Sequence, residues 1–120
     1  MGTELWSKSA LELAAMIAGR EVSSREVVEA HLARIDAVNP RLNAVVRVLA
    51  DEARAGADAA DAAVRSGGPL GRFHGVPVTV KENIDVAGTP TTQGVPMLAE
   101  AVSPMDAPLV ERAQIGRAHV

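Results

Sequence analysis

The chain has 120 residues, a formal net charge of −3, 48% hydrophobic residues and no cysteine. This balance of charge excludes a basic surface for nucleic acid or anionic membranes, and the lack of cysteine excludes disulfides, thiolate metal sites and a cysteine nucleophile. Because no apolar run reaches the roughly 18–20 residues of a membrane span, and Met1–Lys8 has no basic, apolar leader pattern, we expect a cytoplasmic protein.

Aromatic residues make up only 2% of the chain, one Trp and one Phe. A self-sufficient core of this size normally contains several aromatic side chains. We therefore expect the chain to be a piece of a larger domain.

Two capping boxes predict the first two helices. Ser9–Glu12 opens a helix that Gly19 ends, and Ser23–Glu26 opens a longer one that Asn39-Pro40 should close, because proline disfavours a helical residue before it. The predicted apolar stripes are Leu11, Leu13, Ala14 and Ile17 in the first helix, and Val27, Val28, His31, Leu32, Ile35 and Val38 in the second.

The next segments predict a short strand and a third helix. Asn43–Leu49 is rich in β-branched residues, and Ala50–Arg65 carries Ala53, Ala57, Ala60 and Val64 at helical spacing. Ser66-Gly67-Gly68-Pro69 then breaks the chain. Within this helix we expect Asp58 and Asp61 to face water.

Beyond the break the sequence is rich in glycine and proline. Val76–Val80 and Ile84–Val86 lie between these residues and are typical of short buried strands. Helices followed by the first strands of a sheet predict an α/β layered fold that is incomplete in this chain.

Lys81 follows the most apolar of these predicted strands. In apolar surroundings the pKa of a lysine falls, and a neutral amine is a competent general base. The alternative is an ordinary solvated side chain, with Glu82 as a surface ion-pair partner. The residues alone leave both interpretations open.

The segment "GPLGRFHGVPVTVKENIDVAGTPTTQGVP", Gly68 to Pro96, resembles the start of the amidase signature family. Ser9–Val46 resembles that family's opening helices, so the resemblance runs from about Thr3 to Arg112. It implies an α/β/α sandwich around a mixed sheet, of which this chain holds the N-terminal helices and first strands. It also implies a Ser–cisSer–Lys triad in which Lys81 is the lysine, a small-molecule amide substrate and no cofactor.

In such a triad one serine attacks the amide carbonyl, and the bridging serine passes its proton to neutral lysine. Backbone N–H groups stabilise the oxyanion. The serines should follow Lys81 in a Gly/Ser-rich region, yet Ser103 is the lone serine there and has no flanking glycines, while Ser66 precedes the lysine. Neither is assigned as the nucleophile, so we expect the 120-residue chain itself to be inactive.

Other residues near the motif are expected to be structural. Gly75 and Pro77 shape the entry to the strand, Thr91–Gly94 turns the chain or lines the site, and Asp85 caps a loop. His31 should be a packed core histidine, and the triad has no role for His74.

The last residues, "QIGRAHV", match a sequencing adapter read through in frame. An Ile-Gly-Arg-like strand of the family is the alternative. We expect residues 1–113 to be amidase sequence and Gln114–Val120 to be an artefact.

Two further functions remain open besides the stand-alone amidase. One is the glutamine-hydrolysing subunit of a tRNA-dependent amidotransferase, which belongs to the same family. The other is a small non-catalytic helical binding module. The sequence indicates neither the amide that is hydrolysed nor the oligomeric state.

Overall fold

The computed structural model describes residues 4–114 and 118–119. The chain divides into two compact units. We call Met1–Val78 with Gly116–Val120 the helical unit and Thr79–Ile115 the loop unit.

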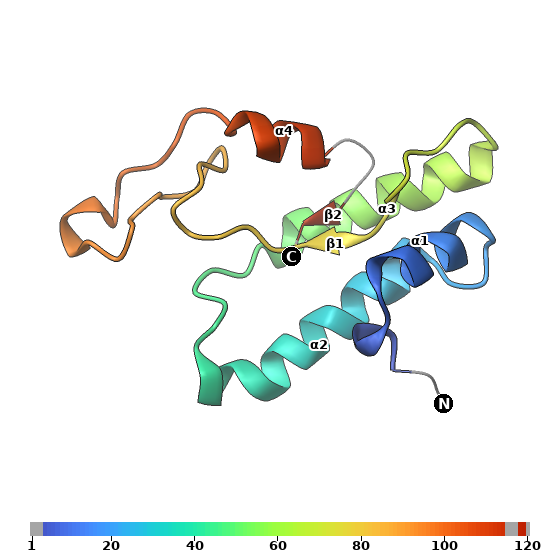
Figure 1. Ribbon diagram of the computed structural model, residues 1–120, viewed down its shortest axis with the longest axis horizontal. Coiled ribbons are helices and arrows are strands. Elements are labelled where there is room, and N and C mark those ends of the chain that lie inside the picture. Colours follow the sequence, from blue (N-terminus) through green and yellow to red (C-terminus); the bar gives the residue numbers. More distant parts are fainter. Residues whose placement is uncertain (1–3, 115–117, 120) are drawn as a thin grey trace. The chain divides into compact units, whose positions relative to one another are not determined.

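The helical unit contains three α-helices and a two-stranded parallel sheet (Figure 1). A 3₁₀-helix, η1 (Leu5–Ser7), precedes the α-helices, and the second strand comes from the end of the chain. The remaining elements in chain order are α1 (Ala10–Ala18), α2 (Ser24–Leu42), α3 (Ala50–Ser66), β1 (Pro77–Val78) and β2 (Ala118–His119).

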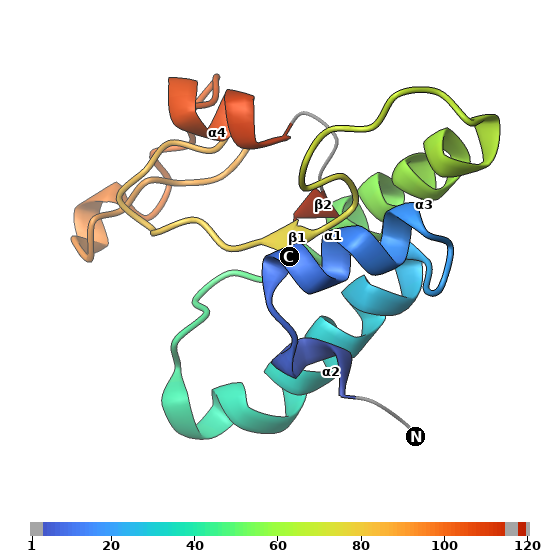
Figure 2. The same ribbon diagram turned by 45° about the vertical axis from the view of Figure 1, so that its right-hand side comes forward.

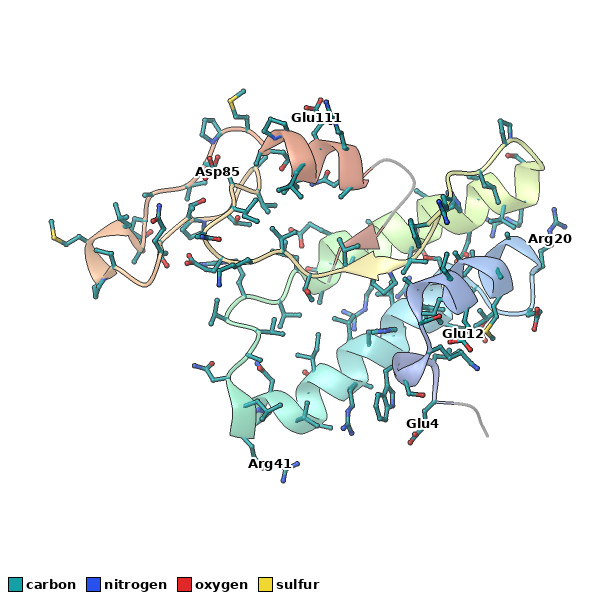
Figure 3. All side chains as sticks on the ribbon, viewed as in Figure 1. Glu4, Glu12, Arg20, Arg41, Asp85 and Glu111 are labelled. Atoms are coloured by element: carbon teal, nitrogen blue, oxygen red, sulfur yellow. The ribbon has the colours of Figure 1, made fainter. Side chains whose placement is uncertain are left out.

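Both predicted capping boxes are present. The Ser9 and Ser23 hydroxyls accept the backbone N–H groups of Glu12 and Glu26, whose carboxylates accept the N–H groups of the serines in return. Figure 3 shows Glu12 on this first turn of α1. Gly19 ends α1 as expected, but Leu11 is 56% exposed, so its place on the buried stripe was wrong.

Helix α2 runs past the proline that was expected to close it. It ends at Leu42, with Asn43 in the left-handed conformation (φ 49°). Pro40 removes one intrahelical hydrogen bond, the one to the carbonyl of Asp36, and Asp36 is exposed to water. A proline in the last turn of an exposed helix end is therefore tolerated.

The predicted strand over Asn43–Leu49 was also wrong, because this segment contains no strand in the structure. Asn39 takes the role that a neighbouring strand would have, since its side-chain amide bonds both the N–H and the carbonyl of Val45. Helix α3 begins at Ala50 as expected and ends at Ser66, with Gly67 at φ 77°.

Helix α2 contributes buried residues to both hydrophobic clusters of the helical unit. Toward α3, its Val28 and Leu32 contact Ala53 and Ala57, whose small side chains allow the helices to approach closely. Its Val27 belongs to a second cluster with three other buried residues, Leu13, Ile17 and Val76. Figure 2 shows α1 next to β1, the strand that directly follows Val76.

A surface network of charged residues joins α2 to α3. The Glu29 carboxylate accepts hydrogen bonds from Arg25 (3.0 Å) and from Arg54 (2.7 Å), and Arg25 also pairs with Asp58 (2.9 Å). The bonds from Arg54 and then Arg25 lower the pKa of Glu29 from its ordinary 4.5 to about 2. Asp58 therefore faces solvent, as expected, but is paired.

Strand β1 pairs in parallel with β2, with Pro77 opposite Ala118 and Val78 opposite His119. The predicted strand Val76–Val80 is thus shortened to two residues. Of the tail that was expected to be adapter sequence, residues 115–117 and 120 lie outside the described residues. The origin of the tail stays a prediction.

The loop unit has little regular structure. It contains η2 (Pro96–Leu98), α4 (Pro108–Gln114) and an isolated antiparallel bridge between Pro90 and Val102. The predicted strand Ile84–Val86 was wrong: the Ile84 N–H and the Val86 carbonyl bond within turns, and the Asp85 carbonyl accepts the Ala107 N–H, without a strand ladder. Among the residues that the structure describes, no helix is both long and apolar enough to cross a membrane.

Candidate active site

The approach to β1 is fixed by three segments that meet at Gly75. The buried hydroxyl of Ser24, at the start of α2, donates to the Gly75 carbonyl (2.5 Å). Asp61 of α3 accepts the backbone N–H groups of Ser24 (2.7 Å) and Arg25 (3.1 Å). Asp61 therefore caps α2 from outside, and the expectation that it simply faces water was wrong.

Gly75 is required at this point by its conformation and by space. Its φ is +78°, and a Cβ on it would lie 3.0 Å from the Ser24 Cβ and 3.3 Å from the Ile17 Cγ2. A side chain would therefore be strained and crowded at once. The structural role expected for Gly75 is confirmed.

Both histidines of the helical unit that are described with their side chains bind backbone carbonyls. The His31 Nδ1 lies 2.7 Å from the Val27 carbonyl oxygen, and the ring is half-buried. His74 is 8% exposed, and its Nε2 lies 2.8 Å from the Ala60 carbonyl oxygen. Each ring nitrogen donates to a carbonyl, which is a structural role.

Lys81 lies in the loop that follows β1, and its side chain is exposed. Within residues 4–114 and 118–119, no hydrogen bond or ion pair engages its ammonium group. The surface ion pair with Glu82, which accompanied the interpretation of Lys81 as a solvated side chain, is thus not formed. The role of Lys81 as a general base stays a prediction.

Glu82 instead binds the Thr91–Gly94 turn. Its Oε1 accepts the N–H of Thr92 (2.6 Å) and the hydroxyl of Thr92 (2.5 Å). The bond from the Thr92 hydroxyl has the largest effect and lowers the pKa of Glu82, and the bond from the Thr92 N–H lowers it further. The nearby N–H groups of Gln93 and Gly94 have a smaller effect in the same direction. Gln93 and Gly94 both have positive φ, and the Gly94 N–H donates to the Thr92 hydroxyl (3.3 Å).

Two further carboxylates stabilise the same unit. Asp85 accepts the Thr91 hydroxyl (2.6 Å) and caps a loop as expected (Figure 3). Asp106 accepts the backbone N–H of Ala87 (2.7 Å). The turns that follow Lys81 are therefore held by side-chain oxygens in place of a sheet.

Ser103 is unsuited to nucleophilic attack. It is 9% exposed, its hydroxyl donates to the Met105 carbonyl (2.7 Å), and its own backbone bonds Gly88 and Thr89. These contacts stabilise the loop. That Ser103 is no member of the triad stays a prediction.

Two residues of this region were missed as anchors from the sequence. Asp61 bonds residues that precede it by 36 and 37 positions, and no local pattern signals such a contact. Glu82 bonds a residue ten positions away. The pair of threonines at Thr91-Thr92 is the one signal for it, because threonines with glycine in a turn are suited to carboxylate binding.

Comparisons with known proteins agree with one another. The family model for Amidase matches residues 26–115. An indoleacetamide hydrolase of Bradyrhizobium diazoefficiens is 51% identical over 106 residues, which are 88% of this chain and 20% of that protein. A glutamyl-tRNA(Gln) amidotransferase subunit of Acidothermus cellulolyticus is 44% identical, over 92% of this chain and 22% of that protein.

Solved structures give the same result. A peptide amidase of Stenotrophomonas maltophilia matches 95% of this chain with 31% identity and a TM-score of 0.85, using 24% of its own length. A bacterial aryl acylamidase of the amidase signature family matches 94% with 31% identity and a TM-score of 0.83. The chain spans about a fifth of the length of the curated relatives that it matches. It belongs to the amidase signature family of α/β enzymes.

Proposed function

We propose that the protein to which this chain belongs hydrolyses a small carboxylic amide to an acid and ammonia or an amine, with Lys81 as the general base. The observation that carries the proposal is the position of Lys81 in "GVPVTVKENID", within a chain 51% identical to an indoleacetamide hydrolase. The ammonium group of Lys81 has no fixed partner in the described residues, which leaves it available to other groups.

The chemistry needs two serines outside this segment. The first attacks the amide carbonyl, the bridging serine takes its proton, and neutral Lys81 accepts the proton from the bridging serine. The lysinium returns the proton to the leaving nitrogen, which departs as ammonia or amine and leaves an acyl-enzyme. Water then hydrolyses the acyl-enzyme to the acid and the free serine.

The test uses the full-length protein and the two lysines of this chain. Lys81→Ala should lower kcat for ammonia release from indoleacetamide by about 10²–10⁴-fold, the usual contribution of a positioned base. Lys8→Ala, which removes the chain's other lysine next to η1, is the matched control and should retain activity. Equal activity of the two variants would refute the role of Lys81.

A second candidate is the glutamine-hydrolysing subunit of a tRNA-dependent amidotransferase. It is favoured by the 44% identity to the glutamyl-tRNA(Gln) amidotransferase subunit over 110 residues. The segment after Lys81 is closer to the stand-alone amidases. Ammonia release from glutamine but not from indoleacetamide, and only with partner subunits present, would establish the second candidate instead.

We also propose an α/β/α sandwich around a mixed sheet for the whole domain, in a cytoplasmic enzyme. The α/β relatives and the cysteine-free chain support these two points. Gln114–Val120 is proposed to be adapter sequence in place of native residues. Resequencing the gene beyond the codon of Arg112 tests this, because a frame that continues to a Gly/Ser-rich stretch with two spaced serines is expected.

A further inference from the structure

The turn that binds Glu82 lies next to the proposed base in the same unit. Glu82 follows Lys81 directly, so its carboxylate is a nearby anion that is able to pair with the lysine. An opposite charge within about 4–6 Å favours the charged form of a lysine. A base that must be neutral to accept a proton is weakened by such a pair.

The structure directs this carboxylate elsewhere. The Thr92 hydroxyl and N–H both donate to the same carboxylate oxygen, at 2.5 and 2.6 Å. We call these two donors of Thr92 the cradle of the carboxylate. The Thr92 hydroxyl in turn accepts the Gly94 N–H (3.3 Å), which leaves its own proton directed at Glu82. Both groups of the cradle donate to the carboxylate, so they bind an anion and do not pair with an ammonium group.

We propose that Glu82 is a positioning residue for Lys81: the hydroxyl and the backbone N–H of Thr92 hold its carboxylate, which fixes the turn after the lysine and withholds the carboxylate from the lysine ammonium. The inference rests on the proposed function, in which Lys81 is the base. It assigns a role to a glutamate that otherwise has the character of an ordinary surface residue.

Other charged groups of the loop unit do not replace Glu82 in this role. Asp85 is bonded to the Thr91 hydroxyl and Asp106 to the Ala87 N–H. The remaining charged side chains described in this unit are the exposed Glu100, Glu111 and Arg112. Glu82 is adjacent to Lys81 in the sequence, so its carboxylate is the one that the fold has to keep from pairing with the lysine.

The test is the pH dependence of kcat/KM in the full-length protein, whose acid limb reports the pKa of the base in the free enzyme. Thr92→Val removes the hydroxyl donor and weakens the cradle. The midpoint of the acid limb should shift to higher pH by about 0.5 unit as the carboxylate moves toward Lys81. At a fixed pH on that limb, this shift lowers kcat/KM about threefold.

Two variants control for simple loss of structure. Thr92→Ser keeps the hydroxyl and should restore the wild-type limb. Thr89→Val removes another threonine hydroxyl of this unit, one that donates to the Val86 carbonyl (2.8 Å), and should leave the limb in place. A rise that occurs equally in Thr89→Val would overturn the proposal.

A charge-removal variant completes the test. Glu82→Gln keeps an acceptor oxygen for Thr92 but has no charge to pair with Lys81. Combined with Thr92→Val, it should cancel the rise of the acid limb. If Thr92→Val leaves the limb unchanged, or if the double variant still shows the rise, Glu82 does not act on Lys81.

Lys81→Ala separates this failure from failure of the proposed function. If Lys81→Ala is inactive and the limb of Thr92→Val does not move, only the role of Glu82 is wrong. If Lys81→Ala has wild-type activity, the proposed function falls and the role of Glu82 falls with it.

Discussion

At the scale of single residues, Gly75 leaves no room for a side chain. Gly75→Ala combines a left-handed backbone with a Cβ 3.0 Å from the Ser24 Cβ. We expect a loss of about 2–4 kcal/mol in the free energy of unfolding of the full-length protein, measured by denaturant titration.

Two other glycines separate the causes of this loss. Gly67 has φ +77° with open space around it, so Gly67→Ala should show the backbone cost of about 1–2 kcal/mol alone. Gly68 has open space and no left-handed φ, so Gly68→Ala should be close to neutral. Equal losses at Gly75 and Gly67 would show that crowding by Ser24 is unimportant.

The second prediction at this scale concerns acid stability. The pKa of Glu29 is about 2 in the folded protein and near 4.5 when the carboxylate is free. The folded state binds this proton less readily, so its contribution to stability is complete above about pH 4.5 and is lost as the pH falls toward 2. Since the side chain is 42% exposed, salt should reduce the effect.

Thermal melts of the full-length protein between pH 6 and pH 2.5 check this. Glu29→Gln should lose stability at pH 6 and converge with wild type at low pH. Glu52→Gln, an exposed glutamate of the neighbouring α3, is the control and should follow the wild-type curve. A constant difference between Glu29→Gln and wild type at every pH would contradict the assignment.

At the scale of elements, the start of α2 depends on a carboxylate of α3. Asp61→Ala leaves the N–H groups of Ser24 and Arg25 without their acceptor in a partly buried place. We expect a loss of about 1–3 kcal/mol in the free energy of unfolding, measured by urea titration. Asp58→Ala removes only an exposed ion pair and should change stability little.

The sequence predicted helices better than strands for a physical reason. The signals that predicted the boundaries of α1, the start of α2 and the end of α3 lie within four residues of each boundary, such as Ser23 with Glu26 or the left-handed Gly67, even though Asp61 adds a distant contact at the start of α2. A strand needs a partner, and Asn43–Leu49 has the Asn39 side chain in its place. Composition alone does not distinguish these two outcomes.

The same division between local and distant contacts determined how much of the site the sequence predicted. The motif around Lys81 was recognised from eleven adjacent positions, Gly75–Asp85, which the sequence presents together. The contacts of Asp61 and of Glu82 depend on how distant segments fold back. The interpretation of Glu82 as a partner of Lys81 was wrong because it considered neighbours along the chain only.

At the scale of the whole molecule, the 120-residue chain should be neither active nor cooperatively folded. The loop unit exposes large apolar side chains, including Met97 (93%), Met105 (68%) and Leu109 (59%). We expect the purified chain to release no ammonia from amides and to melt without a sharp transition in calorimetry. A single sharp transition would support the alternative of a self-contained helical binding module.

The junction of Ser24, Asp61 and Gly75 also bears on how the protein is made. All three residues lie in the first 75 positions of the chain. A ribosome adds about 5–20 residues per second. The junction can therefore close while later parts of the polypeptide are still being translated, so the chain up to Gly75 is folded before the residues that follow Lys81 leave the exit tunnel.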